Sequence, residues 1–347
     1  MDSSPPLVSV VLLNYNGKRL VKLWWPILNL EYPNYEVIFF DNGSTDGSQE
    51  DFRRLASSRP CLATRILGVG QNVGYSKANN IAVQHASGKY VVLLSNDVEV
   101  TPCWLTNMIR FMESRPDVGV AQSVMYQLQN HSKHDVSGNY IDVFGFNHRL
   151  RPPSRPVEVF YSEGAVMFIR TTVLRDVRWL FDDDYFMFYE DVDFCWRAQL
   201  RGQRIFVVPD SYVYHQRGGT VPGVVMRLDP KYVRTNTRNR LATLFKNYGA
   251  ANVLKYLPVS IALEILKGCW LCVNRKSLAG FACFRGVVDF LFALPHLIPR
   301  RRTVQTRRVV SERVILRRIF GPSQAFRELT AYAGQLKVNM VRPVTKT

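Results

Sequence analysis

The sequence predicts an α/β fold, with a mostly parallel central sheet flanked by helices and a basic helical extension after it. Two observations carry this prediction. Residues 7–100 alternate between short apolar, β-branched runs and segments with helical spacing, which indicates βαβ units. After about residue 230 the chain becomes helical in pattern, basic and strongly apolar. We therefore expect an α/β domain over residues 1–230 and a helical region over residues 231–347.

The expected elements follow in chain order. Strands are expected at residues 7–14, 35–40, 64–69, 90–94, 118–125, 164–169, 205–208 and 212–215. Helices are expected at residues 18–30, 48–57, 75–86 and 172–177, and from the acidic, aromatic stretch 181–195 to Leu200. Another helix is expected to open at Thr101-Pro102, with Thr101 as N-cap and Pro102 at the first helical position. The polar residues 127–157 indicate a long loop or a small excursion.

The charge of the chain is concentrated in its last third. The 347 residues carry 45 Lys and Arg against 28 Asp and Glu, a formal net charge of +17. Residues 1–230 have a balance of −1 and residues 231–347 a balance of +18, so the C-terminal third suits an anionic partner. A hydrophobic content of 47% excludes wholesale disorder, a collagen-like repeat and a coiled coil.

The C-terminal region suggests contact with a membrane surface. Residues 254–273 and 278–299 are the most hydrophobic segments, yet charged residues interrupt both and no uncharged run reaches 18 residues, so we do not expect them to span a bilayer. Eight arginines follow between residues 300 and 318, a pattern typical of helices lying in a membrane interface against anionic headgroups. The alternative is a helical subdomain packed on the core with a solvated basic face. Residues 1–6 lack the pattern of a cleaved signal peptide.

Polar clusters at the ends of three expected strands mark a candidate binding site. They occupy residues 14–17, 41–44 and 95–97, and in an open parallel sheet ligands bind outside the carboxyl ends of the strands. Each cluster taken singly is compatible with an ordinary polar turn. Neither GxxxxGK[ST] nor GxGxxG occurs, so P-loop and dinucleotide-binding sites lack their phosphate cradles.

Two further places carry residues suited to chemistry. Asp97 ends a strand and is a candidate ligand for a hard divalent cation, while His215 at the end of a later strand is by itself more typical of a structural histidine. Glu190, Asp191 and Asp193 lie among aromatic residues, which can raise a carboxyl pKa and tune a general base. The competing interpretation of this acidic group is a helix N-terminus that complements the helix dipole.

Seven segments together resemble a known family. In order they read VSVVLLNYNG, DNGSTDGS, NVGYSKANN, LLSNDVEV, EGAVMFIR, FDDDYFMFYEDVDFCWRAQLRG and VYHQRGG. They resemble the family-2 inverting glycosyltransferases of GT-A fold, most of all the rhamnosyltransferase-type members, over roughly residues 7–220. The resemblance implies the nucleotide-diphospho-sugar transferase fold for the α/β domain.

The resemblance also implies roles for residues of the donor site. Asp41 would bind the base or ribose of the nucleotide, and the asparagines that would line the same nucleotide-sugar pocket are Asn14, Asn16, Asn72 and Asn96.

The same resemblance assigns the metal and the catalytic carboxylates. Asp97 matches the last acid of the DXD-like motif that holds Mn²⁺ or Mg²⁺ on the diphosphate, and His215 would complete that metal site. The first acid of the motif is replaced by Ser95, which leaves one protein carboxylate for the metal. Asp191 would be the catalytic base, and Glu190 would position the acceptor or the base.

These residues lead to an expected function. We expect transfer of a sugar from a nucleoside diphosphate sugar, with TDP-rhamnose favoured by resemblance, to a hydroxyl of a glycan or polyprenyl-linked glycan, with inversion. We expect the enzyme at the cytoplasmic face of the cell membrane, held there peripherally or monotopically on anionic lipid. The alternatives are a nucleotidyltransferase and a nucleic-acid-binding protein that uses the arginines, although aliphatic residues interleave these arginines and nucleic acid is not expected as a partner.

Overall fold

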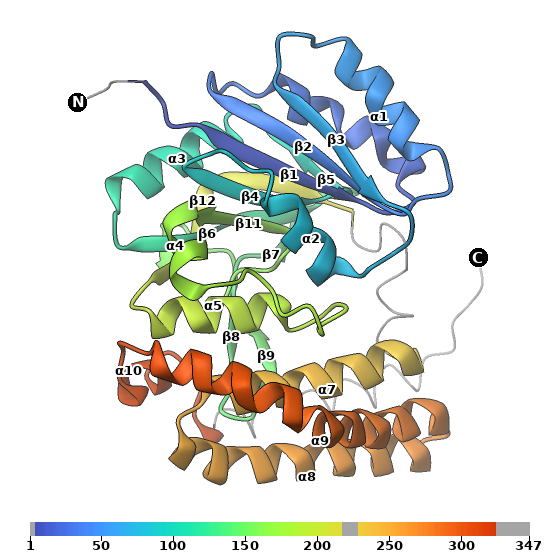
Figure 1. Cartoon of the computed structure of the whole chain (residues 1–347), viewed down its shortest axis with the longest axis vertical. Coiled ribbons are helices and arrows are strands. Elements are labelled where there is room, and N and C mark those ends of the chain that lie inside the picture. The colour runs from blue at the N-terminus through green and yellow to red at the C-terminus, as the bar shows by residue number, and fades with distance from the viewer. Residues whose placement is uncertain (1–3, 217–227, 324–347) are drawn as a thin grey trace.

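The computed structural model describes residues 4–216 and 228–323, in which one large sheet lies above layers of helices (Figure 1). The sheet has ten strands in the order β10-β12-β6-β11-β4-β1-β2-β3, with β5 paired to β12 and β7 to β6, and β8 pairs with β9 separately. Their bounds are β1 Val8–Asn14, β2 Tyr35–Asn42, β3 Thr64–Val69, β4 Tyr90–Ser95, β5 Val98–Val100, β6 Val118–Gln127, β7 Asn130–Val136, β8 Asn139–Ile141, β9 Asn147–Arg149, β10 Val157–Glu158, β11 Val166–Arg170 and β12 Arg204–His215.

The parallel part of the sheet is the one expected from the βαβ pattern. β1 lies between β2 and β4 and is parallel to both, and β3 is parallel to β2. β11 runs antiparallel between β4 and β6, so the sheet as a whole is mixed. All seven residues of β1 are buried, as a strand covered on both faces requires.

Helices cover both faces of the sheet. Val10 and Leu12 point to a core closed by the 3₁₀-helices η1 and η2, α1 and α3, while Val11 and Leu13 point to a core closed by α2, α4, α5 and α7. The bounds are η1 Lys18–Leu23, η2 Trp25–Asn29, α1 Ser48–Ser57, α2 Tyr75–Val83, α3 Trp104–Ser114, α4 Thr171–Val177, α5 Glu190–Leu200, α7 Pro230–Asn247, α8 Ala250–Val273, α9 Ser277–Thr306 and α10 Glu312–Leu316.

Several expected elements differ from the structure. The helix expected at residues 18–30 is two 3₁₀-helices, because Pro26 interrupts it and disfavours a helical residue before it. The helix expected after Thr101 begins at Trp104, and the Thr101 hydroxyl instead donates to the carbonyl of Tyr212 at 3.0 Å. The two strands expected at residues 205–208 and 212–215 are one strand, β12. Residues 127–157, expected as a long loop or a small excursion, contain the polar strands β7 to β9, which form through pairing rather than through β propensity.

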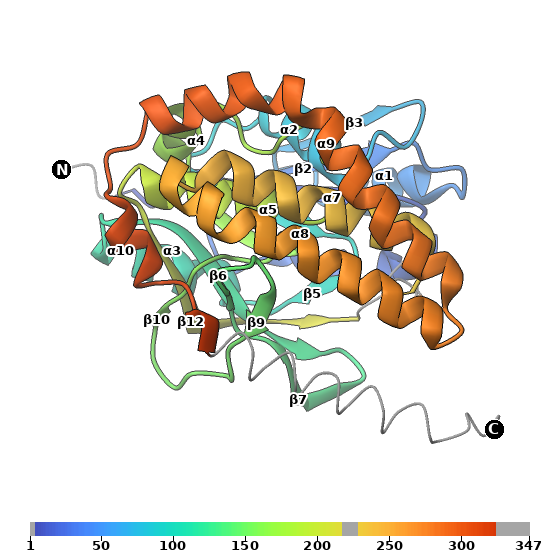
Figure 2. The same cartoon turned by 90° about the horizontal axis from the view of Figure 1, so that it is seen from below.

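The C-terminal region forms the helical layers farthest from the sheet (Figures 1 and 2). α7 packs against α5 and α9, and α8 packs against α9. Its last residues, 324–347, lie outside the described part of the chain, as do residues 217–219 of the VYHQRGG segment. α8 and α9 are long and apolar enough to cross a membrane by length and composition, although each is partly buried against its neighbours.

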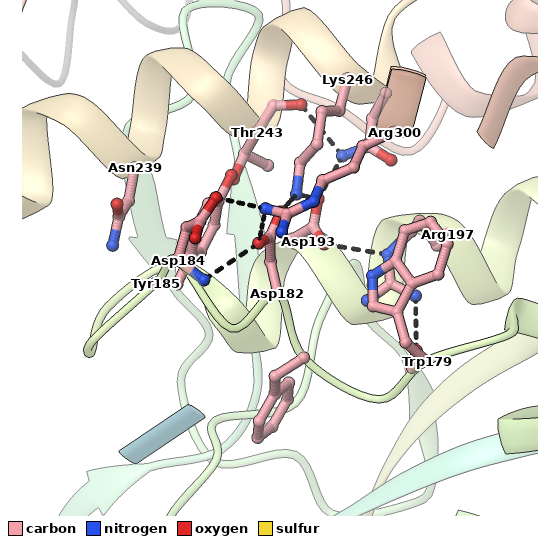
Figure 3. Close-up of polar contacts among 12 residues, drawn as sticks. Trp179, Asp182, Asp184, Tyr185, Asp193, Arg197, Asn239, Thr243, Lys246 and Arg300 are labelled. Carbon is pink, nitrogen blue, oxygen red and sulfur yellow. Dashed lines mark hydrogen bonds and ion pairs between the residues drawn. The ribbon is translucent and has the colours of Figure 1, made fainter. Parts of the chain in front are cut away.

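A buried charge cluster joins this helical region to α5 (Figure 3). The ammonium of Lys246 on α7 is fully buried and lies 2.6 Å from Asp182 Oδ2 and 3.0 Å from Asp193 Oδ1. The other oxygen of Asp193 accepts from Arg197 Nε at 2.9 Å. Arg300 on α9 contacts Asp182 and also lies 2.6 Å from Asp184. Lys246 and Arg300 together hold the pKa of Asp182 at about 2 against the opposing effect of burial.

Most of the arginines between residues 300 and 318 form hydrogen bonds or ion pairs with other residues of the protein. A cluster that only binds lipid headgroups would instead leave its guanidinium groups facing solvent. Those bonded to described residues are Arg300, Arg301, Arg307, Arg308 and Arg318. Arg302, Arg313 and Arg317 are exposed. The cluster therefore mainly ties the helical region to the α/β domain.

We expect Lys246→Met to lower the free energy of unfolding by about 3–5 kcal/mol, because it removes the buried cation that Asp182 and Asp193 share and leaves each of them with one arginine. Urea unfolding at neutral pH measures this. Lys255→Met, at an exposed position of α8, is the control and should change stability by no more than about 0.5 kcal/mol. Because the pKa of Asp182 is lowered, the stability it contributes is present above its unfolded pKa of about 3.9 and is lost as the pH falls toward 2. Equal unfolding curves for the two variants would contradict the role of the cluster.

Candidate active site

The carboxyl ends of β1, β2 and β4 meet at one edge of the sheet and bring three expected site residues together. The register places Asn14 opposite Asp41, and Leu13 opposite Ser95. Asn14 Nδ2 lies 2.9 Å from Asp41 Oδ1, and Asn96 Nδ2 donates to Asn14 Oδ1 at 2.8 Å. The three polar strand ends therefore form one connected group rather than three independent turns.

Both polar ends of the Asn14 side chain are occupied by protein atoms. Besides Asp41, its Nδ2 has Ser44 Oγ at 3.1 Å and Ser48 Oγ at 2.8 Å, and the residue is fully buried. Asp41 in turn accepts from the backbone nitrogen of Ser44 at 2.9 Å. Asn14 thus orders the turn that presents Asp41, and this differs from the direct pocket-lining position that the resemblance implies.

Asn16 and Asn72 flank this turn. Asn16 has a positive φ of 47°, a conformation that asparagine tolerates, and its Oδ1 accepts from the backbone nitrogen of Thr45 at 2.9 Å. Asn72 is exposed, and its Oδ1 accepts from Asn42 Nδ2 at 3.1 Å and from the backbone nitrogen of Gly74 at 2.9 Å. Both asparagines therefore border the same strand edge.

Strand pairing brings Asp97 and His215 together, although 118 positions separate them in the sequence. β5 and the end of β12 are antiparallel with His215 opposite Val98, and the backbone nitrogen of Gln216 donates to the carbonyl of Asp97 at 2.9 Å. His215 Nε2 lies 3.4 Å from Asp97 Oδ2, while its Nδ1 lies 2.9 Å from Asp135 Oδ2. Burial lowers the pKa of His215, but the negative charges of Asp97 and Asp135 outweigh it and raise that pKa to about 10.

This arrangement fits a divalent metal with few protein ligands. Histidines that bind metals commonly direct the second ring nitrogen to a carboxylate, as His215 does to Asp135. Within residues 4–216 and 228–323, no three or more His, Cys, Asp or Glu side chains gather as a metal cluster. Asp97 and His215 would hold the ion, with the remaining positions left to a bound ligand and water.

The turn before α5 has a strained backbone that α7 supports. Phe188 and Tyr189 have positive φ values of 71° and 66°, which non-glycine residues rarely adopt and which cluster at functional sites. Asn239 on α7 donates through Nδ2 to the carbonyls of Met187 at 3.0 Å and Phe188 at 2.9 Å. The helical region thus contributes directly to the geometry of the residues that follow this turn.

Glu190 and Asp191 begin α5. Asp191 is half-buried and accepts from the backbone nitrogens of Val192 at 2.8 Å and Gly164 at 3.3 Å. Burial, with the charge of Glu163, raises the pKa of Asp191 to about 7. Burial and the charge of Asp191 raise the pKa of Glu190 well above its ordinary value.

Glu190 and Asp193 differ in their surroundings. Glu190 Oε2 is buried without a hydrogen-bond partner among the described residues, as expected of a group that awaits a ligand. Asp193 lies in the Lys246 cluster instead, and its pKa is lowered because the charges of Lys246 and Arg197 outweigh burial. Asp191 and Asp193 therefore occupy separate environments, as their angular separation on a helix predicts.

Tyr75 lies between the candidate metal ligand Asp97 and the Glu190–Asp191 pair. Its hydroxyl donates to the carbonyl of Gly164 at 2.7 Å, and the backbone nitrogen of Gly164 donates to Asp191. Burial raises the pKa of Tyr75 well above the ordinary value, and the negative charges of Glu190, Asp191 and Asp97 raise it further. Asp97 and the Glu190–Asp191 pair are thus both close to Tyr75.

Comparison with known proteins identifies the family. Residues 9–178 match the glycosyl transferase family 2 model. This part of the chain is a family 2 glycosyltransferase domain. The chain is similar to an uncharacterized glycosyltransferase of Haemophilus influenzae, at 24% identity over 75% of this chain and 80% of the relative, and to the rhamnosyltransferase WbbL of Escherichia coli, at 24% identity over 60% of this chain and 83% of the relative.

A solved structure supports the fold of the glycosyltransferase. The mannosyltransferase PcManGT from Pyrobaculum calidifontis, in complex with GDP-Man and Mn²⁺, has a TM-score of 0.52 and 17% identity, and the match covers 83% of this chain and 88% of that one. The GT-A fold expected from the sequence is thereby confirmed, and the enzyme transfers sugar from a nucleotide-sugar donor.

Three residues at the site of this glycosyltransferase were not identified from the sequence. Asp135 lies in the segment interpreted as a loop, and only its pairing with β6 brings it to His215. Glu163 begins the EGAVMFIR segment, which is the one signal that marked its neighbourhood. Asn239 lies on α7, in the helical region for which no site residue was expected.

We expect Asn239→Ala to lower kcat about 10- to 100-fold while nucleotide-sugar binding stays unchanged, because the strained turn loses both donors and Asp191 shifts. Asn239→Asp, which keeps the shape but removes the donor, should behave like the alanine variant. The apparent pKa of the pH–rate profile should also move, which a merely destabilised enzyme would not show. Asn236→Ala, half-exposed on the same helix, is the control. Normal turnover in both Asn239 variants would contradict the positioning role.

Proposed function

We propose that the enzyme transfers the sugar of a nucleoside diphosphate sugar, with inversion, to a hydroxyl of a glycan or lipid-linked glycan. The observation that carries this proposal is the Glu190–Asp191 pair, in which burial raises the pKa of Asp191 to about 7. A general base is most effective when its pKa lies near the working pH. Asp191 is half-buried rather than fully buried, so part of its surface is open to a hydroxyl.

In this mechanism Asp191 accepts the proton of the acceptor hydroxyl as its oxygen attacks the anomeric carbon. The bond from the anomeric carbon to the diphosphate oxygen breaks on the opposite side, and the electron pair leaves with the nucleoside diphosphate. Burial and the charge of Asp191 raise the pKa of Glu190, which favours the protonated carboxyl, and its unpartnered Oε2 is available for a hydrogen bond with the acceptor. One displacement inverts the configuration without a covalent intermediate.

The donor would be held at the strand edge. Asp41 and Asn96, ordered by Asn14, would form the floor of the nucleotide-sugar site, with Asn16 and Asn72 at its border. Asp97 and His215 would hold Mn²⁺ or Mg²⁺, which when bound neutralises the charge that develops on the leaving diphosphate. The Mn²⁺ in the mannosyltransferase structure supports this choice of ion.

The donor sugar and the place of action are part of the proposal. Similarity to a rhamnosyltransferase favours TDP-rhamnose as donor and cell-surface polysaccharide or glycolipid synthesis as the setting. Exposed large apolar side chains on α8 and α9, among them Leu254, Val273 and Phe292 at 79%, 82% and 79% exposure, favour attachment of the outer helical layer to the cytoplasmic face of the membrane. Anionic lipid would add to this through the exposed arginines Arg302, Arg313 and Arg317.

We expect Asp191→Asn to lower kcat about 10²- to 10⁴-fold with little change in donor affinity. In the unaltered enzyme kcat/KM should rise with pH and level off above about 7, because the base works unprotonated, and this limb should vanish in the variant. Steady-state kinetics over pH and separate nucleotide binding measure both effects.

Two neighbouring variants serve as controls. Glu190→Gln should act mainly on acceptor use, and Asp193→Asn mainly on stability, since Asp193 lies in the Lys246 cluster. A folded, inactive Asp193→Asn beside a normally active Asp191→Asn would overturn the assignment of the base.

We expect Asp97→Ala to abolish transfer in a protein that remains folded, and a chelator to do the same to the unaltered enzyme, with recovery on addition of Mn²⁺ or Mg²⁺. Calorimetry should show that Asp97→Ala no longer binds the metal ion and that Asp135→Asn binds it more weakly. The second variant removes the negative charge that His215 Nδ1 contacts. Glu99→Ala, on the neighbouring strand β5, is the control. Full activity in the presence of chelator would contradict the proposed role of the metal ion.

A further inference from the structure

A cavity of about 550 Å³ lies between α7, α9 and the segment that precedes the strained turn at Phe188 and Tyr189. α7 contributes Lys231 and Arg238, α9 contributes Leu278, Phe281 and Arg285, and the segment contributes Phe186. The cavity is separate from the strand edge that carries the donor-site residues. Nothing in the mechanism above uses it.

Some of the basic side chains that line the cavity have no carboxylate partner. Four basic and two acidic side chains line it. One basic residue, Arg234, is paired with Asp289 at 2.8 Å, and the second acid, Asp184, is paired with Arg300 at 2.6 Å. Lys231, Arg238 and Arg285 remain, and none of them forms an ion pair with a residue of the described chain. The cavity therefore has an unbalanced positive charge suited to a ligand with a multiply charged anionic group.

Part of the cavity lining is apolar. Leu278 is 75% exposed and Phe281 59% exposed, although both line the cavity. Farther along the same helix Val288, Leu291 and Phe292 are exposed as well. A ligand whose anionic group lay among the basic side chains would have apolar surface beside it, and this surface continues onto the proposed membrane face.

Phe186 forms a wall shared with the catalytic site. Its carbonyl accepts from the backbone nitrogen of Tyr75 at 2.7 Å, and its ring stands where a side chain at Gly74 would lie. Lys231 Nζ, which lines the cavity, lies 5.0 Å from the centre of the same ring. Phe186 also comes two positions before the strained turn at Phe188 and Tyr189, so a ligand against Phe186 would lie close to the segment that leads to Asp191.

We propose that this cavity binds the phosphate or diphosphate group of a lipid-linked acceptor, with the lipid chain over Leu278 and Phe281 and the glycan directed to Asp191. The inference rests on the proposed glycosyl transfer and deepens it by naming the acceptor class. Arg285, Lys231 and Arg238 bind the anionic group. A membrane-embedded lipid of this kind reaches the site from the face that α8 and α9 present.

The first test measures binding of the full chain to phosphatidylcholine vesicles doped with undecaprenyl diphosphate, in EDTA so that no metal contributes. Vesicles doped with phosphatidylserine to equal charge are the comparison. We expect a preference for the diphosphate lipid, which Arg285→Gln weakens about tenfold, equivalent to ~1.4 kcal/mol. Arg302→Gln is the matched control, since Arg302 is an exposed arginine of the same helix outside the cavity.

Other outcomes of the binding test overturn the proposal. Equal weakening by the two variants would mean a general basic surface. Full competition by free inorganic pyrophosphate at the concentration of the lipid would mean a site for soluble anions instead of lipid.

The second test uses transfer kinetics to separate this inference from the proposed function. Arg285→Gln should raise KM for a diphosphate-linked lipid acceptor and leave KM for the donor, and for a short soluble glycan acceptor, unchanged. Unchanged KM values for both acceptors would overturn the cavity as acceptor site while the transfer activity stands. Failure of the unaltered enzyme to bind or hydrolyse any nucleotide sugar would instead overturn the proposed function.

Discussion

The ion pair between Lys246 and Asp193 is the interaction on which the catalytic geometry depends. It joins α7 to the first turn of α5, where Asp191 and Asp193 stand two positions apart and face different surroundings. A buried lysine with two carboxylates stabilises only when all three remain paired, because each unpaired charge would carry its full desolvation penalty. The pairing therefore admits one orientation of α5, in which Asp193 is held within the helical region and Asp191 is directed to the opposite side. The proposed base, Asp191, is therefore aligned by Asp193, which has no role in the proposed reaction.

The C-terminal region combines two properties that its composition alone does not distinguish. Its inner side is polar and bonded to the α/β domain, through contacts such as Arg300 with Asp184 and Asn239 with the carbonyl of Phe188. Its outer side retains exposed Leu and Phe side chains. A packed subdomain and a membrane-facing layer are thus compatible descriptions of opposite faces of the same helices.

The sequence predicted the parallel half of the sheet closely, because apolar β-branched runs and strand-end turns are local signals; β3 and α1 have the expected bounds. The polar strands β7 to β9 were missed, since their pairing and not their composition makes them strands. In the site, Asp97 and His215 could be named from their motifs. Asp135 could not, because its place beside His215 results from the pairing of β7 with β6. The pKa of Asp191 likewise depends on burial by segments distant in the sequence.

The strained turn at Phe188 and Tyr189 has a consequence for synthesis of the chain. Domains fold from the N-terminus as they leave the ribosome, and the sheet and α5 are complete by His215. The donors that hold the turn come from Asn239, and the cation that aligns α5 comes from Lys246. A nascent chain that ends before α7 has its central strands but lacks the two α7 side chains that hold the strained turn and α5. If Asp191 is the base, as we propose, transfer can begin only after α7 has emerged and docked.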